Sequence, residues 1–187
     1  MRYTDVCIEA ASHFLPKRIV SSTAVEKWLK PVYDRLHLPE GRLELMTGIR
    51  ERRFWEKGTR PSQVAATAGR LALEKANVAR KKIGCLIHCA VSRDFLEPAT
   101  ASVVHRLLDL PRTAMNLDIS NACLGVLTGM VMVANMIQGG QIEAGMVVTG
   151  ETAEPLLDGT VAKLLGDETL TRRTIKPQIA SLTIGSA

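Results

Sequence analysis

The sequence predicts an α/β protein whose mostly parallel sheet is covered by helices on both faces. Three observations lead to this fold class. Several strand-like segments are apolar throughout instead of alternating, as strands buried on both faces are. These segments alternate with helical patterns, which favours parallel strands joined by crossover helices. One helical segment near the middle of the chain has almost no polar face, which is typical of a helix in the interior.

The first half of the chain carries the weaker signals. A capping box, Thr23-Ala-Val-Glu26, predicts the start of a helix that Pro31 interrupts. Basic chain follows Gly48 and is expected to be irregular up to the proline that begins an amphipathic helix. In order, we expect a strand at Tyr3–Ala10, a helix at Thr23–His37, a helical turn at Gly41–Thr47 and a helix at Pro61–Asn77.

The second half is clearer because its apolar runs are bounded by turn residues. Gly139-Gly140 ends the apolar helix, as paired glycines after a helix commonly do. Glycines within that helix lower its stability, and close packing against another element is their expected role. We expect strands at Ile83–Val91, Ala114–Ser120, Ala144–Thr149 and Ile179–Ile184, and helices at Thr100–Leu108, Ala122–Gln138 and Thr152–Leu165.

Composition excludes several classes of function. The chain has 187 residues, a net charge of +5 and 4% aromatic residues, and its charges are scattered. Nucleic-acid binding would need a basic stripe with stacking aromatics, so no nucleic-acid partner is expected. No apolar run reaches the roughly 18 residues of a membrane span, and the start lacks the hydrophobic core of a signal peptide. These features predict a protein without a membrane span that is not secreted. The chain is too long and too apolar to need disulfides, so its four cysteines are expected to be reduced thiols, which indicates the cytoplasm.

The cysteines Cys85 and Cys89 are predicted to be core residues and not metal ligands. They lie on one face of the expected strand Ile83–Val91, while His88 faces the other way, so they cannot form a tetrahedral site together. None of the four histidines has a metal-binding spacing, and each is expected on the surface or as a satisfied core residue. No dinucleotide fingerprint, phosphate loop or Gly-x-Ser-x-Gly elbow is present, so we expect neither metal nor cofactor.

Cys123 is the candidate nucleophile because it is expected at the N-terminus of the apolar helix. The positive end of a helix dipole favours the thiolate, and free N–H groups there can bind an oxyanion. The residue pattern also allows Cys123 to be a small buried hydrophobe, and the two interpretations stand side by side at this point.

Several motifs together resemble the thiolase superfamily. They are Asp118-Ile-Ser-Asn-Ala-Cys-Leu-Gly125, the Gly-Gly stop and Ala144-Gly-Met-Val-Val-Thr-Gly-Glu151. Gly48-Ile-Arg-Glu-Arg52 and Leu182-Thr-Ile-Gly-Ser-Ala187 are similar to signatures of the β-ketoacyl-acyl-carrier-protein synthase III family. Val91-Ser-Arg-Asp-Phe-Leu-Glu-Pro98 resembles the long-chain acyl-CoA condensing enzymes of bacterial olefin synthesis more closely still.

The resemblance implies a duplicated α/β fold, with residues 1–187 as its N-terminal thiolase-like domain. It implies that Cys123 is acylated and that the substrates are acyl-CoA and, as a further candidate, acyl carrier protein. It also implies a homodimer. The family's catalytic His and Asn lie in the second half, so we expect this chain to be the first half of a longer enzyme.

Glu97 lies where the resemblance places a loop residue that reaches the neighbouring subunit, and in the olefin-pathway enzymes a Glu there is thought to act as a base. A malonyl donor forms its carbanion by losing carbon dioxide, whereas a plain acyl-CoA must lose an α-proton to a base. Glu97 therefore favours joining two acyl-CoAs over the decarboxylating reaction. Two alternatives stay open: Glu97 is only a solvated loop carboxylate, or the chain is a non-catalytic thiolase-like half-domain that dimerises or binds an apolar ligand.

Overall fold

The computed structural model describes residues 2–187, which form two compact units. The first unit combines the chain up to Phe14 with Gly58–Glu151, and the second combines Leu15–Lys57 with Thr152–Ala187. Both candidate catalytic residues, Glu97 and Cys123, belong to the first unit.

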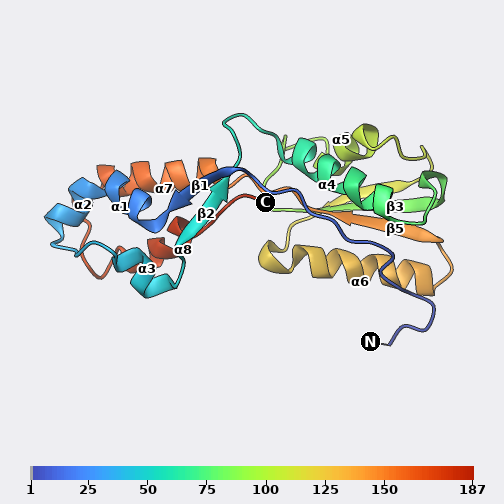
Figure 1. The fold of residues 1–187 in the computed structure, drawn as a ribbon, viewed down its shortest axis with the longest axis horizontal. Coiled ribbons are helices and arrows are strands. Elements are labelled where there is room, and N and C mark those ends of the chain that lie inside the picture. Colours follow the sequence, from blue (N-terminus) through green and yellow to red (C-terminus); the bar gives the residue numbers. More distant parts are fainter. Residues whose placement is uncertain (1) are drawn as a thin grey trace. The chain divides into compact units, whose positions relative to one another are not determined.

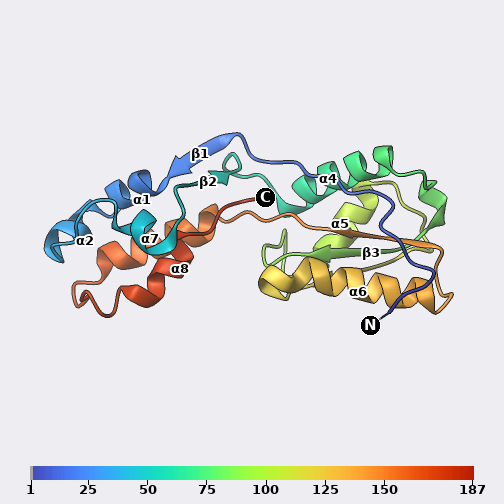
Figure 2. The same ribbon diagram turned by 60° about the horizontal axis from the view of Figure 1, so that its bottom comes forward.

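A three-stranded parallel sheet forms the centre of the first unit. The central strand β3 (Ile83–Cys89) pairs with β4 (Met115–Ile119) on one side and with β5 (Ala144–Val148) on the other. Helices α4 (Pro61–Lys75) and α5 (Thr100–Leu107) cover one face, and α6 (Gly125–Gln138) covers the other (Figures 1 and 2). A short 3-10 turn, η1 (Arg80–Lys82), leads into β3. The predicted parallel sheet with helices on both faces is confirmed.

Strand β3 is buried on both faces, which explains why its sequence is apolar throughout. Cys85, Ile87 and Cys89 pack in the core beneath α6, whereas Leu86 packs in the core against α4 and α5. The interpretation of Cys85 and Cys89 as core residues is confirmed. Among residues 2–187, no group of His, Cys, Asp and Glu side chains has an arrangement that could hold a metal ion.

Helix α6 differs from the prediction at its start and in its burial. A 3-10 turn, η2 (Ala122–Leu124), precedes it, so the α-helix begins at Gly125. One side, including Gly125, Gly129 and Val133, is buried on the sheet. The other side exposes Leu127, with 58% of its surface accessible. The expectation of burial all round is wrong for this chain, because within the described residues the helix covers one sheet face only.

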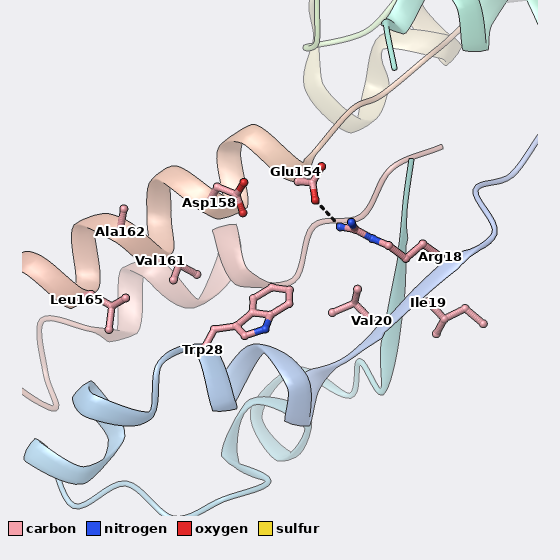
Figure 3. A pocket seen from close by; sticks show the side chains of 9 residues that line it. All are labelled: Arg18, Ile19, Val20, Trp28, Glu154, Asp158, Val161, Ala162 and Leu165. Carbon is pink, nitrogen blue, oxygen red and sulfur yellow. Dashed lines mark hydrogen bonds and ion pairs between the residues drawn. The ribbon is translucent and has the colours of Figure 1, made fainter. Parts of the chain in front are cut away.

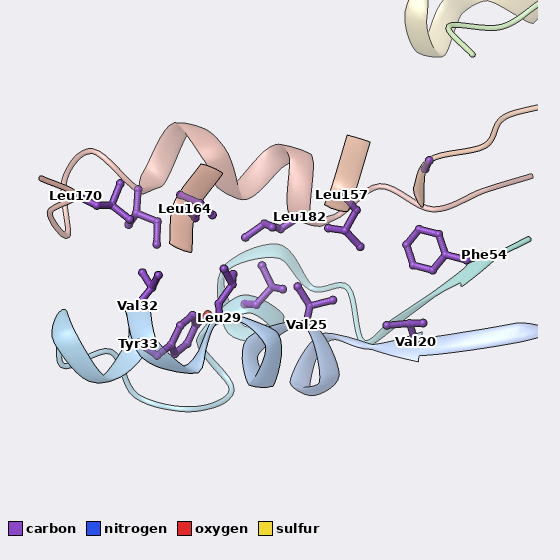
Figure 4. Packing of buried hydrophobic residues seen from close by; sticks show 13 residues of the cluster. Val20, Val25, Leu29, Val32, Tyr33, Phe54, Leu157, Leu164, Leu170 and Leu182 are labelled. Atoms are coloured by element: carbon purple, nitrogen blue, oxygen red, sulfur yellow. The ribbon is translucent and has the colours of Figure 1, made fainter. Parts of the chain in front are cut away.

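The second unit surrounds a separate core. Strand β1 (Arg18–Ser21) pairs antiparallel with β2 (Glu51–Phe54). Figure 4 shows the apolar cluster, in which Phe54, Leu29 and Leu157 come from different elements. The helices are α1 (Ser22–Trp28), α2 (Lys30–Arg35), α3 (Arg42–Thr47), α7 (Glu154–Gly166) and α8 (Ile179–Leu182), with a 3-10 turn η3 (Lys176–Gln178). No helix among residues 2–187 is both long and apolar enough to cross a bilayer.

Two predicted strands are absent from the structure. At residues 3–10 the chain pairs with no strand; instead the Tyr3 hydroxyl donates to Asn135 Oδ1 (2.9 Å) and the Thr4 N–H donates to Gln138 Oε1 (2.9 Å), both at the end of α6. Residues 179–182 form the helical turn α8, which places Leu182 in the second core. Each apolar run has the length of a strand, but neither forms a ladder of hydrogen bonds with a described strand. Contact with β2 begins just beyond the second run, where the Ser186 N–H donates to the Arg53 carbonyl (2.8 Å).

The predicted start of the first helix is also wrong. Ser21 caps α1 by accepting a hydrogen bond from the Ala24 N–H (3.0 Å), two residues before the expected cap. Glu26 is buried and does not close a capping box. Its carboxylate instead accepts hydrogen bonds from the N–H groups of Gly41 (2.8 Å) and Leu43 (2.6 Å), at the start of α3. The break expected around Pro31 is confirmed, since α1 and α2 meet at Leu29.

Strand β2 lies where irregular basic chain was expected. Its charged residues hide the usual apolar signal, yet Arg52 and Phe54 are buried while Glu51 and Arg53 are exposed. The Arg52 guanidinium donates to Ser22 Oγ (2.8 Å), which satisfies one of its N–H donors inside the unit. Burial lowers the pKa of Arg52. A period of two was therefore present in the sequence, but one of its buried positions is occupied by an arginine.

Candidate active site

Three loops of the first unit begin at one edge of its sheet. Because β3, β4 and β5 are parallel, their carboxyl ends share an edge, where ligand sites of α/β sheets commonly lie. The loop after β3 carries Glu97, the turn after β4 carries Cys123, and the segment after β5 ends in Glu151. The fold thus brings the segments of both predicted site residues to the same edge. No hydrogen bond joins the two side chains within the described residues.

Cys123 lies in the turn η2, and its thiol is exposed, unlike the thiols of Cys85 and Cys89. The expectation of a buried position is wrong for this chain, and so is the alternative that Cys123 is a buried packing residue. The preceding residue, Ala122, has a φ of 44°, in the left-handed region. This conformation costs an L-residue roughly 1–2 kcal/mol. A side-chain hydrogen bond from Asn121 Nδ2 to Thr128 Oγ1 (3.0 Å) braces the turn against α6.

Glu97 lies in the loop between β3 and α5, and its side chain is exposed. Next to it, Leu96 has 87% of its surface accessible and Phe95 has 43%. The guanidinium of Arg60 lies over the Phe95 ring, 5.5 Å from its centroid. The tip of this loop therefore presents one carboxylate and two large apolar side chains to the solvent.

Hydrogen bonds to three carboxylates fix this loop at both ends. At its start, Glu151 accepts from the N–H groups of Val91 (2.7 Å) and Ser92 (3.0 Å), and from the Ser92 hydroxyl. In its middle, Asp94 accepts from the Ser62 N–H (2.9 Å) and hydroxyl at the start of α4. The tip with Glu97 is thus exposed on a loop whose first half is firmly tied down.

At the end of the loop, Asp118 caps helix α5. Its two carboxylate oxygens accept from the N–H groups of Thr100 (2.8 Å) and Ala101 (2.7 Å). A carboxylate at a helix N-terminus is favourable because it pairs with the unsatisfied N–H groups and the positive end of the dipole. Sequence reasoning missed these anchoring roles of Asp94, Asp118 and Glu151. The available signal was an acidic residue at the end of a predicted strand, as at Asp118 and Glu151.

His88 is buried beside this network, with 1% of its surface accessible. Its Nδ1 lies 3.4 Å from Asp118 Oδ1, and among the described residues neither ring nitrogen has a partner in hydrogen-bond geometry. Burial lowers the pKa of His88, although the neighbouring carboxylates of Asp118, Glu151 and Asp94 act in the opposite direction. The ring is therefore neutral near pH 7. The expectation of a core position is confirmed for His88, and its nearest polar partner is Asp118.

The second unit contains a groove of about 640 Å³ that holds neither candidate residue. Figure 3 shows Arg18 reaching Glu154, with which it forms an ion pair, and the Trp28 ring between α1 and α7. The lining is mixed, because it includes the apolar side chains of Ile19 and Leu165 and the carboxylate of Asp158.

The fold and the position of Cys123 define a thiolase-like half-fold, and comparison with known families agrees. Residues 44–163 match the family described as Thiolase, N-terminal domain. The chain therefore belongs to the thiolase family. This result confirms the family and the fold class expected from the motifs.

Among individual proteins, the chain is similar to acyl-CoA:acyl-CoA alkyltransferases. It is 39% identical over 186 residues to the one from Shewanella oneidensis, covering 100% of this chain and 53% of that protein. It is 28% identical over 153 residues to β-ketoacyl-[acyl-carrier-protein] synthase III of Koribacter versatilis, covering 82% of this chain and 44% of that protein. The chain thus spans about half the length of the curated relatives it matches.

Solved structures of OleA from Xanthomonas campestris share the fold. The acetamide-bound structure has a TM-score of 0.92 and 35% identity, covering 100% of this chain and 57% of that one. Other structures of the same protein carry a substitution at a glutamate or at a cysteine. Those two positions are as far apart along that chain as Glu97 and Cys123 are along this one.

Proposed function

We propose that this chain is the N-terminal half of a condensing enzyme of the OleA kind, which joins two acyl-CoAs through an acyl-cysteine at Cys123. One observation carries the proposal. An exposed thiol, that of Cys123, lies in the turn after β4, at the same edge of the thiolase-type sheet where the Glu97 loop begins. The similarity to acyl-CoA:acyl-CoA alkyltransferases and the matching glutamate–cysteine spacing support it.

In the first half-reaction, the Cys123 thiolate attacks the thioester carbonyl of an acyl-CoA. A new C–S bond forms, the old C–S bond breaks and coenzyme A leaves as its thiolate. Helix α6 begins directly after this turn and has no side-chain cap, so the positive end of its dipole can stabilise the oxyanion of the intermediate, although the Gly125 N–H itself donates to the Ala122 carbonyl.

In the second half-reaction, the Glu97 carboxylate takes the α-proton of a second acyl-CoA. The resulting carbanion attacks the carbonyl of the acyl-cysteine, a C–C bond forms and the thiolate of Cys123 is released. Glu97 lies on an exposed loop tip, which suits a base that a homodimer presents to the site of the other subunit. Acyl-CoA supplies both halves of the product, with acyl carrier protein as a candidate carrier.

The nucleophile is tested in the full-length enzyme that contains this chain. Incubation with acyl-CoA and mass spectrometry of peptides should place the acyl group on Cys123. Cys123→Ser should abolish labelling while the protein stays folded, and Cys7→Ser, which removes the other exposed thiol, should leave it unchanged. An acyl group on Cys7, Cys85 or Cys89 would contradict the assignment. No labelling of any cysteine would favour the non-catalytic alternative.

The base is tested by separating the two half-reactions. Glu97→Ala should still acylate Cys123 but lose condensation by about 10²–10⁴-fold, the usual contribution of general-base catalysis. A malonyl donor should partly restore condensation, because decarboxylation forms the carbanion without proton removal. Glu74→Gln, at an exposed carboxylate on α4, serves as the control. If Glu97→Ala joins acyl-CoAs as fast as the unsubstituted enzyme, the decarboxylating synthase becomes the better assignment.

A further inference from the structure

We propose that His88 is a positioning residue. Through Asp118, it fixes the position of the loop that carries the candidate base Glu97 relative to the turn that carries the candidate nucleophile Cys123. This role rests on the proposed function. It requires that the buried imidazole donate a hydrogen bond from Nδ1–H to the Asp118 carboxylate.

Asp118 is the connection between the two candidate catalytic segments. It lies in β4, five residues before Cys123 on the same chain segment. Its carboxylate holds the Thr100 and Ala101 N–H groups at the start of α5, directly after the loop that carries Glu97. A change in the orientation of this carboxylate therefore moves the loop relative to the turn.

His88 is placed to control that orientation. It lies on β3 directly opposite Asp118 of β4 in the parallel register, and its Nδ1 lies 3.4 Å from Oδ1, the oxygen that also accepts from Ala101. Closing this separation by a few tenths of an ångström gives an ordinary N–H···O bond. A third donor would then fix the carboxylate from the strand side, while the two helix N–H groups hold it from the other side.

A histidine buried at position 88 costs stability, which suggests that its polar ring has a role there. A buried polar group without a partner destabilises a fold, and an apolar side chain at position 88 would have no such cost. The ionisable groups near the ring are Asp118 from β4, Glu151 after β5 and Asp94 from the loop after β3. All three already accept hydrogen bonds from backbone N–H groups. The neutral ring can donate through one nitrogen only, and Nδ1 is the one that faces Asp118.

Three substitutions separate this hydrogen bond from simple packing. In His88→Asn the amide nitrogen can take the place of Nδ1, in His88→Gln it takes the place of Nε2, and His88→Val removes the donor. In the full-length enzyme, His88→Val and His88→Gln should slow condensation at least tenfold with acylation of Cys123 unchanged, and His88→Asn should restore most of the rate. A packing role predicts instead that all three variants lose activity in proportion to their loss of stability.

Two measurements do not depend on catalysis. Hydrogen exchange of the Thr100 and Ala101 amides should accelerate about fivefold to tenfold in His88→Val and His88→Gln, the effect of one ordinary hydrogen bond, and not in His88→Asn. In ¹⁵N-histidine NMR spectra, His88 should be the neutral Nδ1–H tautomer between pH 7 and 8. An Nε2–H tautomer, or unchanged exchange in His88→Val, would overturn the proposal. An enzyme without condensing activity would refute the proposed function while these two measurements still decide the role of His88.

Discussion

The sulfur of Cys89 lies so close to Gly129 that a Cβ at position 129 would be 2.6 Å from Sγ. The same Cβ would lie 3.0 Å from a methyl carbon of Val147. Helix α6 can approach strands β3 and β5 this closely because residue 129 has no side chain. The contact fixes the height of α6 above the sheet, and with it the turn that carries Cys123.

Gly129→Ala should therefore destabilise the protein by about 1–3 kcal/mol, the usual cost of overpacking a core. Gly125→Ala is the matched control, because its Cβ would lie 3.5 Å from Cys89 Cβ, an ordinary contact. Alanine is the better helix former by roughly 1 kcal/mol, so Gly125→Ala should be neutral or stabilising. Urea unfolding of each variant measures both effects. Equal stability of the two variants would show that α6 can shift on the sheet without cost.

Alkaline pH should destabilise the first unit through the same cysteine. Burial raises the pKa of Cys89 to about 11 from a normal value of 9.0. The thiol is neutral in the folded protein over a range in which the unfolded chain already carries the thiolate. Stability is therefore complete below pH 9 and falls as the pH rises toward 11, by up to about 2–3 kcal/mol for a shift of this size.

The contribution of Cys89 is isolated by comparing variants. Burial also raises the pKa values of Cys85 and Tyr33, so the unsubstituted protein loses stability for several reasons above pH 9. Cys89→Ala should show a shallower fall in its urea midpoint between pH 8.5 and 10.5. Cys7→Ala, which removes an exposed thiol, should keep the original slope. The assignment fails if the slopes of these two variants coincide.

The second unit depends on the buried carboxylate of Glu26. One oxygen accepts from the Leu43 N–H (2.6 Å) and the Tyr33 hydroxyl (3.1 Å), and the other accepts from the Gly41 N–H (2.8 Å). Glu26→Gln replaces one acceptor oxygen by an amide that cannot accept, which leaves a donor unpaired and should cost about 1–3 kcal/mol. Glu44→Gln, an exposed carboxylate in α3, should stay within about 0.5 kcal/mol. Thermal unfolding of the two variants tests this difference.

The most accurate sequence predictions concern elements whose environment repeats along the chain. Strand β3 is buried on both faces, so nearly every residue in it is apolar, and β5 is apolar as well. Strand β4 is only half-buried and contains Asn116 and Asp118, yet apolar residues still alternate with these polar ones. Helix α4 was predicted to within two residues because its proline start and its apolar spacing agree. By contrast, β2 contains Glu51, Arg52 and Arg53, and its partner strand is far away in sequence. No local pattern distinguishes such a strand from basic loop.

The chain near its end shows the opposite error. The run 179–184 has the length and apolar content of a strand, but it forms the turn α8, which places Leu182 in the second core. Only the chain after this run contacts β2, through the Ser186 N–H and the Arg53 carbonyl. Residues 3–10 form no strand ladder either, and their polar groups bind the end of α6. Short apolar segments are ambiguous until their partners are known.

The sequence alone determined the family, the parallel sheet and the two candidate residues, because these depend on motifs and on periodicity within single segments. Only the tertiary structure decided which side chains hold the site together. Asp118 caps a helix that begins eighteen residues earlier in the chain, Glu151 binds the loop after β3, and the buried ring of His88 lies beside Asp118. These contacts join segments distant in sequence, and the folded sheet brings them together at one edge. An acidic residue at the end of a predicted strand could mark Asp118 and Glu151 as candidates, but no local pattern could name their partners.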